Sequence, residues 1–192
     1  MILTPKIQKA INEAARLHHE QKRKGDGLPY VVHLFSVAVI LSNYTNDEDI
    51  IAAGLLHDTI EDVPGYTKEE LEKDFGKRVA EIVEGVTEEK FIGQNEKATW
   101  RNRKEGYLEK LQQDSEEAML VCAADKIHNL DSMIDGIKLQ GEKYWSNFNS
   151  SAEGKLWFYE EVFKILKGRL NSSIVNELEQ SINKAKEVLN EQ

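Results

Sequence analysis

Apolar residues recur along this chain at intervals of three and four, the spacing of α-helices that pack one face against a core. The first such segment follows Thr4 and Pro5, which form an N-cap and a proline in the first helical turn. Its apolar positions are Ile7, Ala10, Ile11, Ala14 and Leu17. The last segment, residues 173–189, has one apolar stripe of the same kind. These patterns predict a helix near each end of the chain.

Turn and cap residues separate further predicted helices between these ends. Pro29 precedes one apolar run, and the polar residues 46–49 precede another. A turn at 64–65 leads to residues 67–70, which have the form of a capping box, and Gly76 is placed to close that helix. Helices are also expected over four later stretches, 79–86, 100–111, 115–134 and 156–170.

No alternating run is long enough to predict a sheet. Segments 88–98 and 136–154 lack helical periodicity, so we predict loops there, the second of them crossing the surface. The predicted fold is all-α, with one domain over residues 1–192. Residues 10–135 carry the motifs described below, and helices within 155–190 are expected to pack on them.

Composition limits the classes of protein that this chain can be. Its 40% hydrophobic and 31% charged residues are typical of a soluble globular domain. The formal charge of −9 argues against a nucleic-acid partner, although a local basic cluster could still receive an anionic substrate. The single cysteine, Cys122, permits no internal disulfide. Without a signal peptide or an apolar span of about 20 residues, the chain is expected to be cytoplasmic, with no membrane partner.

Polar residues interrupt the apolar segments at three places. His33 and Asp125 each lie in an apolar run, and His57-Asp58 end another. Such groups are costly in apolar surroundings unless something neutralises them. Any one of them is more often a hydrogen-bonded core residue or an ion-pair partner. Their joint occurrence favours a four-ligand site for a divalent metal, and imidazole with carboxylate suits manganese, iron, zinc or magnesium.

Glu61 and Asp62 follow this pair by about one helical turn. In a continuous helix, Glu61 would project from the same face as His57 and Asp58, close enough to orient or deprotonate a water beside the metal. Adjacent carboxylates also tend to raise one of their pKa values toward the range of general acid–base catalysis. An acidic helix end on the surface explains the pair equally well, so position alone leaves both interpretations open.

Several segments together resemble the HD-domain phosphohydrolases, and in particular the RelA/SpoT hydrolase domain. Residues 23–33 (RKGDGLPYVVH) resemble its RKG-x-G-x-PY-x-x-H segment, and residues 57–62 (HDTIED) its HDxxED signature. Residues 125–130 (DKIHNL) resemble its D-[KR]-[IL]-x-N-[LM] motif, with shorter matches at 75–79 and 83–87.

The chain also departs from the family pattern. Leu34 stands where the family usually has proline, and the basic segment 99–104 has no assigned counterpart. A nucleotide-contacting tyrosine of the family would fall near Phe158 or Tyr159.

The resemblance implies a helical HD-domain bundle with one divalent metal, usually Mn²⁺, that releases pyrophosphate from the 3′ position of guanosine tetra- or pentaphosphate. The implied metal ligands are His33, His57, Asp58 and Asp125. The implied catalytic pair is Glu61 and Asp62. The implied substrate contacts are Arg23, Lys24 and Asn129, whose guanidinium, ammonium and amide groups suit a nucleotide.

Two alternatives stay open beside this hypothesis. The chain could hydrolyse another nucleotide, or it could be a non-catalytic nucleotide-binding module. The HDxxED signature favours the alarmone substrate over the first, and the presence of every ligand and of the carboxylate pair argues against the second. The expected partner is a small nucleotide, and the sequence indicates no oligomeric state.

Overall fold

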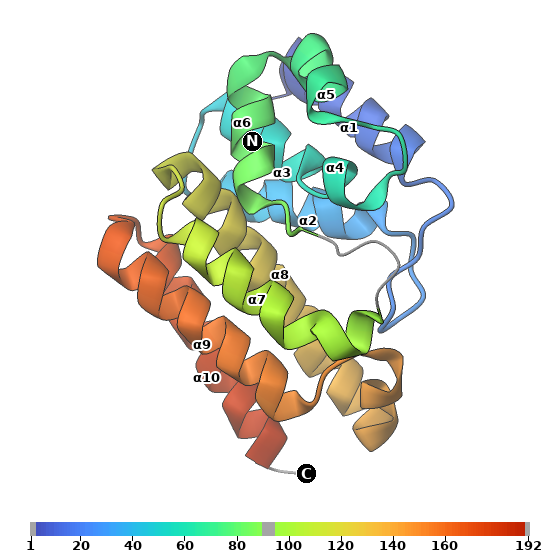
Figure 1. Ribbon diagram of the computed structural model, residues 1–192, viewed down its shortest axis with the longest axis vertical. Coiled ribbons are helices and arrows are strands. Elements are labelled where there is room, and N and C mark those ends of the chain that lie inside the picture. The colour runs from blue at the N-terminus through green and yellow to red at the C-terminus, as the bar shows by residue number, and fades with distance from the viewer. Residues whose placement is uncertain (1–2, 90–94, 191–192) are drawn as a thin grey trace.

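Ten α-helices and one 3₁₀ helix form the computed structural model, which describes residues 3–89 and 95–190 (Figure 1). In chain order they are α1 (Pro5–Leu17), α2 (Val31–Leu41), α3 (Glu48–Leu56), α4 (Thr59–Asp62), α5 (Lys68–Phe75), α6 (Lys77–Val86), α7 (Glu96–Leu111), α8 (Glu116–Gln140), η1 (Gly141–Asn147), α9 (Ala152–Arg169) and α10 (Ile174–Asn190). The only β-type pairing in the described residues is an isolated bridge between Lys22 and Pro29. The prediction of an all-α fold is therefore confirmed.

Helix α3 lies at the centre of the N-terminal half, where it contacts α1, α2, α6 and α8. Every residue from Ile50 to Leu56 is buried. Gly54 allows α2 to come close, because a Cβ atom at this position would lie 2.4 Å from Leu41 Cδ1. Asp47 caps the helix by accepting from Asp49 N–H at 2.9 Å, as its acidic start predicts. A fully buried α3 thus carries its C-terminal residues to the middle of the molecule.

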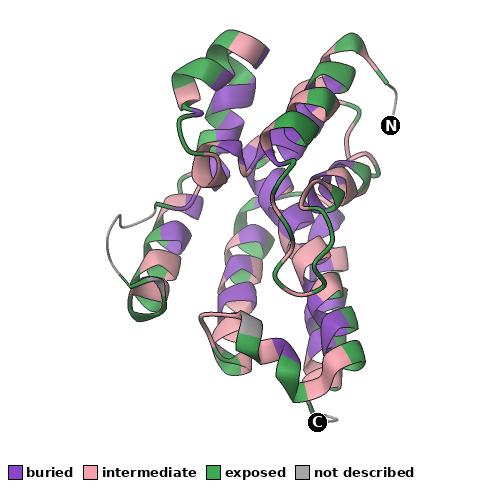
Figure 2. Ribbon diagram, turned by 90° about the vertical axis from the view of Figure 1, so that its right-hand side faces the viewer, coloured by how far each residue is buried: buried purple, intermediate pink, exposed green. Residues whose placement is uncertain are grey.

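The long helix α8 connects the two halves, since it contacts α2, α3 and α6 on one side and α9 and α10 on the other. Buried residues follow the inner faces of these helices, and exposed residues follow the outer faces (Figure 2). No helix in the described ranges is long and apolar enough to cross a membrane. The assignment of residues 1–192 to one domain stays a prediction.

Helix α8 continues to Gln140, six residues beyond its predicted end at residue 134. The prediction of a surface loop over 136–154 is therefore wrong. Gly136 is a packing residue inside the helix, where a Cβ atom would lie 2.2 Å from Tyr144 Cε2. The glycine that ends the helix is Gly141, with a φ of 60°. Tyr144 is consequently buried against α8.

The start of α7 also differs from the prediction of a loop over 88–98. The helix begins at Glu96, because the side chain of Asn95 accepts from the backbone N–H groups of Lys97 and Ala98. Residues 90–94 of the predicted loop lie outside the described residues. The basic segment 99–104 therefore belongs to a helix.

Candidate functional site

The four predicted metal ligands lie together at the centre of the molecule. His33 comes from α2, His57 and Asp58 from the junction of α3 and α4, and Asp125 from α8. His33 Nε2 lies 3.3 Å from His57 Nε2 and 3.2 Å from Asp125 Oδ1. His57 Nε2 lies 3.1 Å from Asp58 Oδ2. His33, His57 and Asp58 each offer one ligand atom within 4.8 Å of the others.

This donor set fits a divalent metal ion. Ligand atoms placed about 2.1 Å from one tetrahedral ion lie about 3.4 Å apart, close to the observed separations. His57 Nδ1 lies 2.9 Å from the carbonyl oxygen of Gly54, to which it donates, so Nε2 is the nitrogen that faces the cluster. Burial lowers the pKa of His57, but Asp58 and Asp125 raise it by more. The two carboxylates thus require a cation at this point, either a proton on the imidazole or a metal ion.

A break in the backbone aims His57 and Asp58 at the cluster. Helix α3 ends at Leu56, and Asp58 has φ −96° and ψ 0°. The side chains of His57 and Thr59 bond to backbone carbonyls three residues earlier, at 2.9 and 2.6 Å, in place of the N–H groups of a continuing helix. The prediction that Glu61 shares one continuous helical face with His57 and Asp58 is therefore wrong. Glu61 belongs to the separate helix α4.

Neighbouring side chains hold both carboxylates in place. Tyr30 donates its hydroxyl to Asp58 Oδ2 at 2.7 Å, and Lys126 Nζ lies 2.5 Å from Asp125 Oδ2. Burial raises the pKa of Asp125, but Lys126 and the two imidazoles outweigh burial and lower it overall. Asp125 therefore stays ionised in its buried position.

The predicted substrate contacts are linked to the metal cluster by hydrogen bonds. Asn129 donates to Asp125 Oδ1 at 2.5 Å and accepts from Arg23 Nη2 at 2.9 Å. Lys24, the next residue along the chain, lines the same cavity as Arg23 and Asn129. The three substrate contacts predicted from the sequence thus lie at the same cavity. Asn129 connects Arg23 directly to the metal ligand Asp125.

His128 is a neighbour of the cluster that the sequence did not single out. Its Nδ1 lies 2.7 Å from His33 Nδ1. Burial and the neighbouring His33 lower the pKa of His128 to about 4, so its ring is neutral and can accept a proton donor. Metal-binding imidazoles usually donate their second N–H to a carboxylate or carbonyl. Here a second imidazole takes that place, three residues after Asp125 on the same helical face.

We expect His128→Phe to weaken metal binding about 10-fold, the lower end of the effect usual for such outer partners. Phenylalanine keeps a ring at this position but cannot accept the His33 N–H. Titration of the metal-free protein with Mn²⁺ in a calorimeter measures the change in Kd. His19→Phe, which replaces an exposed imidazole, is the control. Equal Kd values for the two variants would rule out the role of His128.

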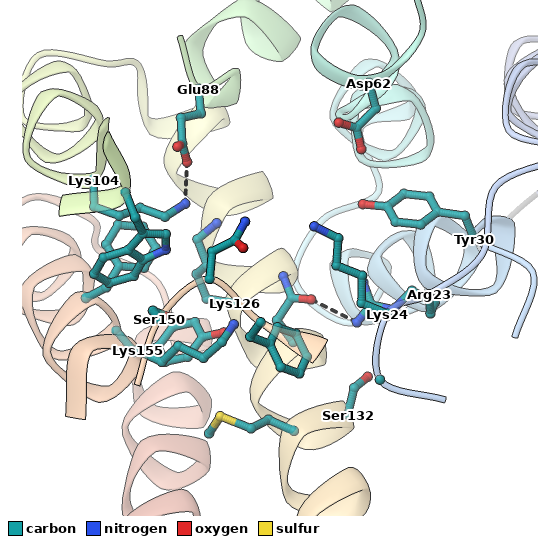
Figure 3. A pocket seen from close by; sticks show the side chains of 18 of the residues that line it. Arg23, Lys24, Tyr30, Asp62, Glu88, Lys104, Lys126, Ser132, Ser150 and Lys155 are labelled. Carbon is teal, nitrogen blue, oxygen red and sulfur yellow. Dashed lines mark hydrogen bonds and ion pairs between the residues drawn. The ribbon is translucent and has the colours of Figure 1, made fainter. Parts of the chain in front are cut away.

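A cavity of about 490 Å³ opens beside the cluster (Figure 3). Seven of its lining residues are basic, namely Lys22, Arg23, Lys24, Arg103, Lys104, Lys126 and Lys155. Four are acidic, namely Asp26, Glu61, Asp62 and Glu88. The basic excess contrasts with the charge of −9 on the whole chain and favours an anionic ligand. Six aromatic residues also line the cavity and offer faces on which a base can stack: Tyr30, Trp100, Tyr144, Phe148, Phe158 and Tyr159.

Both residues of the predicted catalytic pair line this cavity. Glu61 Oε2 accepts the backbone N–H of Glu88 at 3.0 Å, and the backbone carbonyl of Asp62 accepts from Gln21 Nε2 at 3.1 Å. The Glu88 side chain in turn pairs with Arg103 and Lys104 on α7. Glu88 lies between α6 and α7, and nothing in the sequence of this loop distinguishes it from other surface carboxylates.

Comparison with known proteins adds a family match. A family model described as HD domain matches residues 10–147. The chain is 41% identical over 130 residues to the guanosine-3′,5′-bis(diphosphate) 3′-pyrophosphohydrolase MESH1 of Danio rerio, covering 66% of this chain and 68% of the relative. It is 36% identical over 134 residues to the putative chloroplastic GTP diphosphokinase RSH1 of Arabidopsis thaliana, of which it spans only 15%.

A solved structure has the same overall arrangement. It is described as a metazoan ortholog of SpoT that hydrolyzes ppGpp and plays a role in starvation responses. The TM-score is 0.76 at 26% identity, covering 96% of this chain and 97% of the other.

Proposed function

Because the chain belongs to the HD domain family, we propose that it is a metal-dependent hydrolase that releases pyrophosphate from the 3′ position of guanosine tetra- or pentaphosphate. The observation that carries this proposal is the position of the His₂Asp₂ cluster directly behind a basic cavity, whose lining residues Tyr30, Lys126 and Asn129 contact its carboxylates. The relative from Danio rerio is named for that activity and is similar over 68% of its length. Mn²⁺ as the ion, a cytoplasmic location and a part in the stringent response belong to the same proposal.

The cavity suits a nucleotide that carries two diphosphate groups. Its volume of about 490 Å³ lies within the range of small-molecule sites. Arg23 Cζ lies 5.8 Å from the centroid of the Tyr30 ring, and its guanidinium can pair with phosphate or stack on a base. Asn129 offers an amide for the nucleotide, and Lys24 and Lys126 add positive charge. Such a lining favours the more highly charged substrate over a nucleoside monophosphate.

His33, His57, Asp58 and Asp125 would hold the ion. When bound, it supplies Lewis-acid polarisation of a phosphoryl oxygen and lowers the pKa of an attacking water. In the proposed reaction, Glu61 accepts a proton from water while the water oxygen bonds to the phosphorus attached to the 3′-oxygen. The bond between that phosphorus and the 3′-oxygen breaks, and the proton passes to the 3′-oxygen. The products from the tetraphosphate are guanosine 5′-diphosphate and pyrophosphate, and those from the pentaphosphate are guanosine 5′-triphosphate and pyrophosphate.

Incubation of guanosine tetraphosphate with the Mn²⁺-loaded protein tests this proposal. We expect equal amounts of guanosine 5′-diphosphate and pyrophosphate, separated by anion-exchange chromatography. Arg23→Ala should lower kcat/KM at least about 10-fold, the loss of one charge-assisted contact, without changing the metal content. If Arg23 contributes only ground-state binding, the loss lies in KM and kcat is preserved.

Lys138→Ala, which removes an exposed lysine, is the matched control for this experiment. Cleavage of a different nucleotide by a protein that leaves guanosine tetraphosphate intact would support the alternative of another HD-type substrate. Absence of hydrolysis with every nucleotide would support a binding module.

A further inference from the structure

Ser150 carries a hydroxyl that is buried at the wall of the cavity. Its Oγ is inaccessible to solvent and makes no hydrogen bond within the described residues. It lies immediately before Ser151, the N-cap of the 18-residue helix α9, and lines the cavity. Buried polar groups in proteins are nearly always satisfied, so an unpaired hydroxyl at a cavity wall indicates a partner that binds there.

The surroundings of Lys155 disfavour a positive charge. It lies near the start of α9, where the helix dipole disfavours positive charge. Within the described residues, no carboxylate forms an ion pair with it, and its Nζ stands 4.1 Å from the centroid of the Phe148 ring. Burial, followed by Lys104 and the other basic residues of the cavity, lowers its pKa to about 7. A lysine kept in such a place is best explained by an anion that it binds.

The two side chains project into the cavity at its α9 end, whereas Asp62 and Tyr30 stand at the opposite end in this view (Figure 3). Tyr30 bonds to the metal ligand Asp58, so the metal cluster borders that end, and Lys126, which pairs with Asp125, brings the cavity into contact with the cluster at a second point. A nucleotide with phosphates at both its 3′ and 5′ positions has anionic groups on either side of its sugar. Such a ligand can reach both ends at once.

We infer that Ser150 and Lys155 form a second anion subsite, which binds the 5′-phosphate groups of the nucleotide while the 3′-diphosphate lies at the metal cluster. This inference rests on the proposed function for the identity of the nucleotide. In this subsite the Ser150 side chain turns from its buried position so that the hydroxyl donates to a phosphate oxygen, and the Lys155 ammonium pairs with the phosphate charge. An anion also complements the N-terminal end of the α9 dipole.

Binding of guanosine 5′-diphosphate and of guanosine to the Mn²⁺-loaded protein separates the phosphate contacts from the contacts of base and sugar. We expect Lys155→Met to weaken binding of the diphosphate by about 10-fold or more, the loss of a charge-assisted contact. Ser150→Ala should weaken it by about threefold, the loss of a neutral hydrogen bond. Guanosine affinity should change less than about twofold in both variants. Calorimetric titration measures each Kd.

Thermal unfolding separates ligand binding from a structural role of Lys155. If Lys155 stabilised the fold, its replacement would lower Tm. Because Lys155 opposes the helix dipole and its basic neighbours, Lys155→Met should leave Tm unchanged or raise it. Lys155→Arg should retain the preference for the diphosphate over guanosine. Lys164→Met, at an exposed position of the same helix where the lysine pairs with Glu161, is the matched control.

The outcomes distinguish this inference from the proposed function. An unchanged ratio of the two Kd values in Lys155→Met would overturn the subsite even if guanosine tetraphosphate is hydrolysed. The same holds if the variant loses Tm and weakens both ligands equally. Conversely, a protein that shows the expected ratios but does not cleave guanosine tetraphosphate would retain the subsite and refute the proposed reaction.

Discussion

Glu61→Gln is expected to keep the bound metal and to lose about 10²–10⁴-fold in turnover, the usual contribution of a general base. The amide has the shape of the carboxylate but cannot accept a proton from water. Its oxygen can still accept the Glu88 backbone N–H that holds Glu61 Oε2 at 3.0 Å, so the position of the side chain is retained. Initial rates of pyrophosphate release and elemental analysis of the same sample measure the two effects.

The turnover of Asp62→Asn shows how much of the proton transfer depends on Asp62 rather than on Glu61. Glu109→Gln, at an exposed position on α7, is the control. If Glu61→Gln and Asp62→Asn both turn over at the parent rate, the pair is only an acidic helix end. The interpretation that the sequence left open would then be correct.

Asp58→Ala and Asp125→Ala should reduce the metal content from about one ion per chain to a small fraction. Each removes one of four ligands, and loss of a ligand costs more than the 10–100-fold in affinity typical of outer partners. Elemental analysis after extensive dialysis measures the content. Full occupancy in both variants would show that the ion, if any, binds elsewhere.

Asp125→Ala should also lower Tm, an effect that is separate from the loss of metal. Lys126 Nζ lies 2.5 Å from Asp125 Oδ2 and is itself largely buried, so Asp125→Ala leaves a buried cation without its partner. Asp125→Asn keeps an oxygen beside Lys126 and loses the negative charge that a metal ion requires. Metal loss in both variants, with the larger drop in Tm for alanine, separates ligation from folding.

The four candidate ligands could be predicted from the sequence because each stands in an apolar run, where a polar residue demands an explanation. The positions of Arg23 and Asn129 followed from the family resemblance, and the hydrogen bond between them joins the first connecting segment to α8. Periodicity also predicted most helices, with ends in error by a few residues.

What could not be predicted depends on contacts between distant parts of the chain. Gly136 has the appearance of a helix stop, and only the position of Tyr144 shows it to be a packing residue. His128 is one more polar position on α8 until its ring is seen 2.7 Å from His33. Ser150 and Lys155 lie in or beside a segment without periodicity, and only the cavity gives them a common role.

The two hydrogen bonds of Asn129 have a thermodynamic consequence. One joins it to the metal ligand Asp125 and the other to Arg23 at the nucleotide cavity, so a single amide takes part in both binding equilibria. If binding of the ion fixes Asp125, it also orders Asn129 and, through it, Arg23. Part of the conformational entropy that these side chains lose on nucleotide binding is then already lost before the nucleotide binds. The coupling is reciprocal: the bound nucleotide raises the affinity for the ion by the same factor by which the bound ion raises the affinity for the nucleotide.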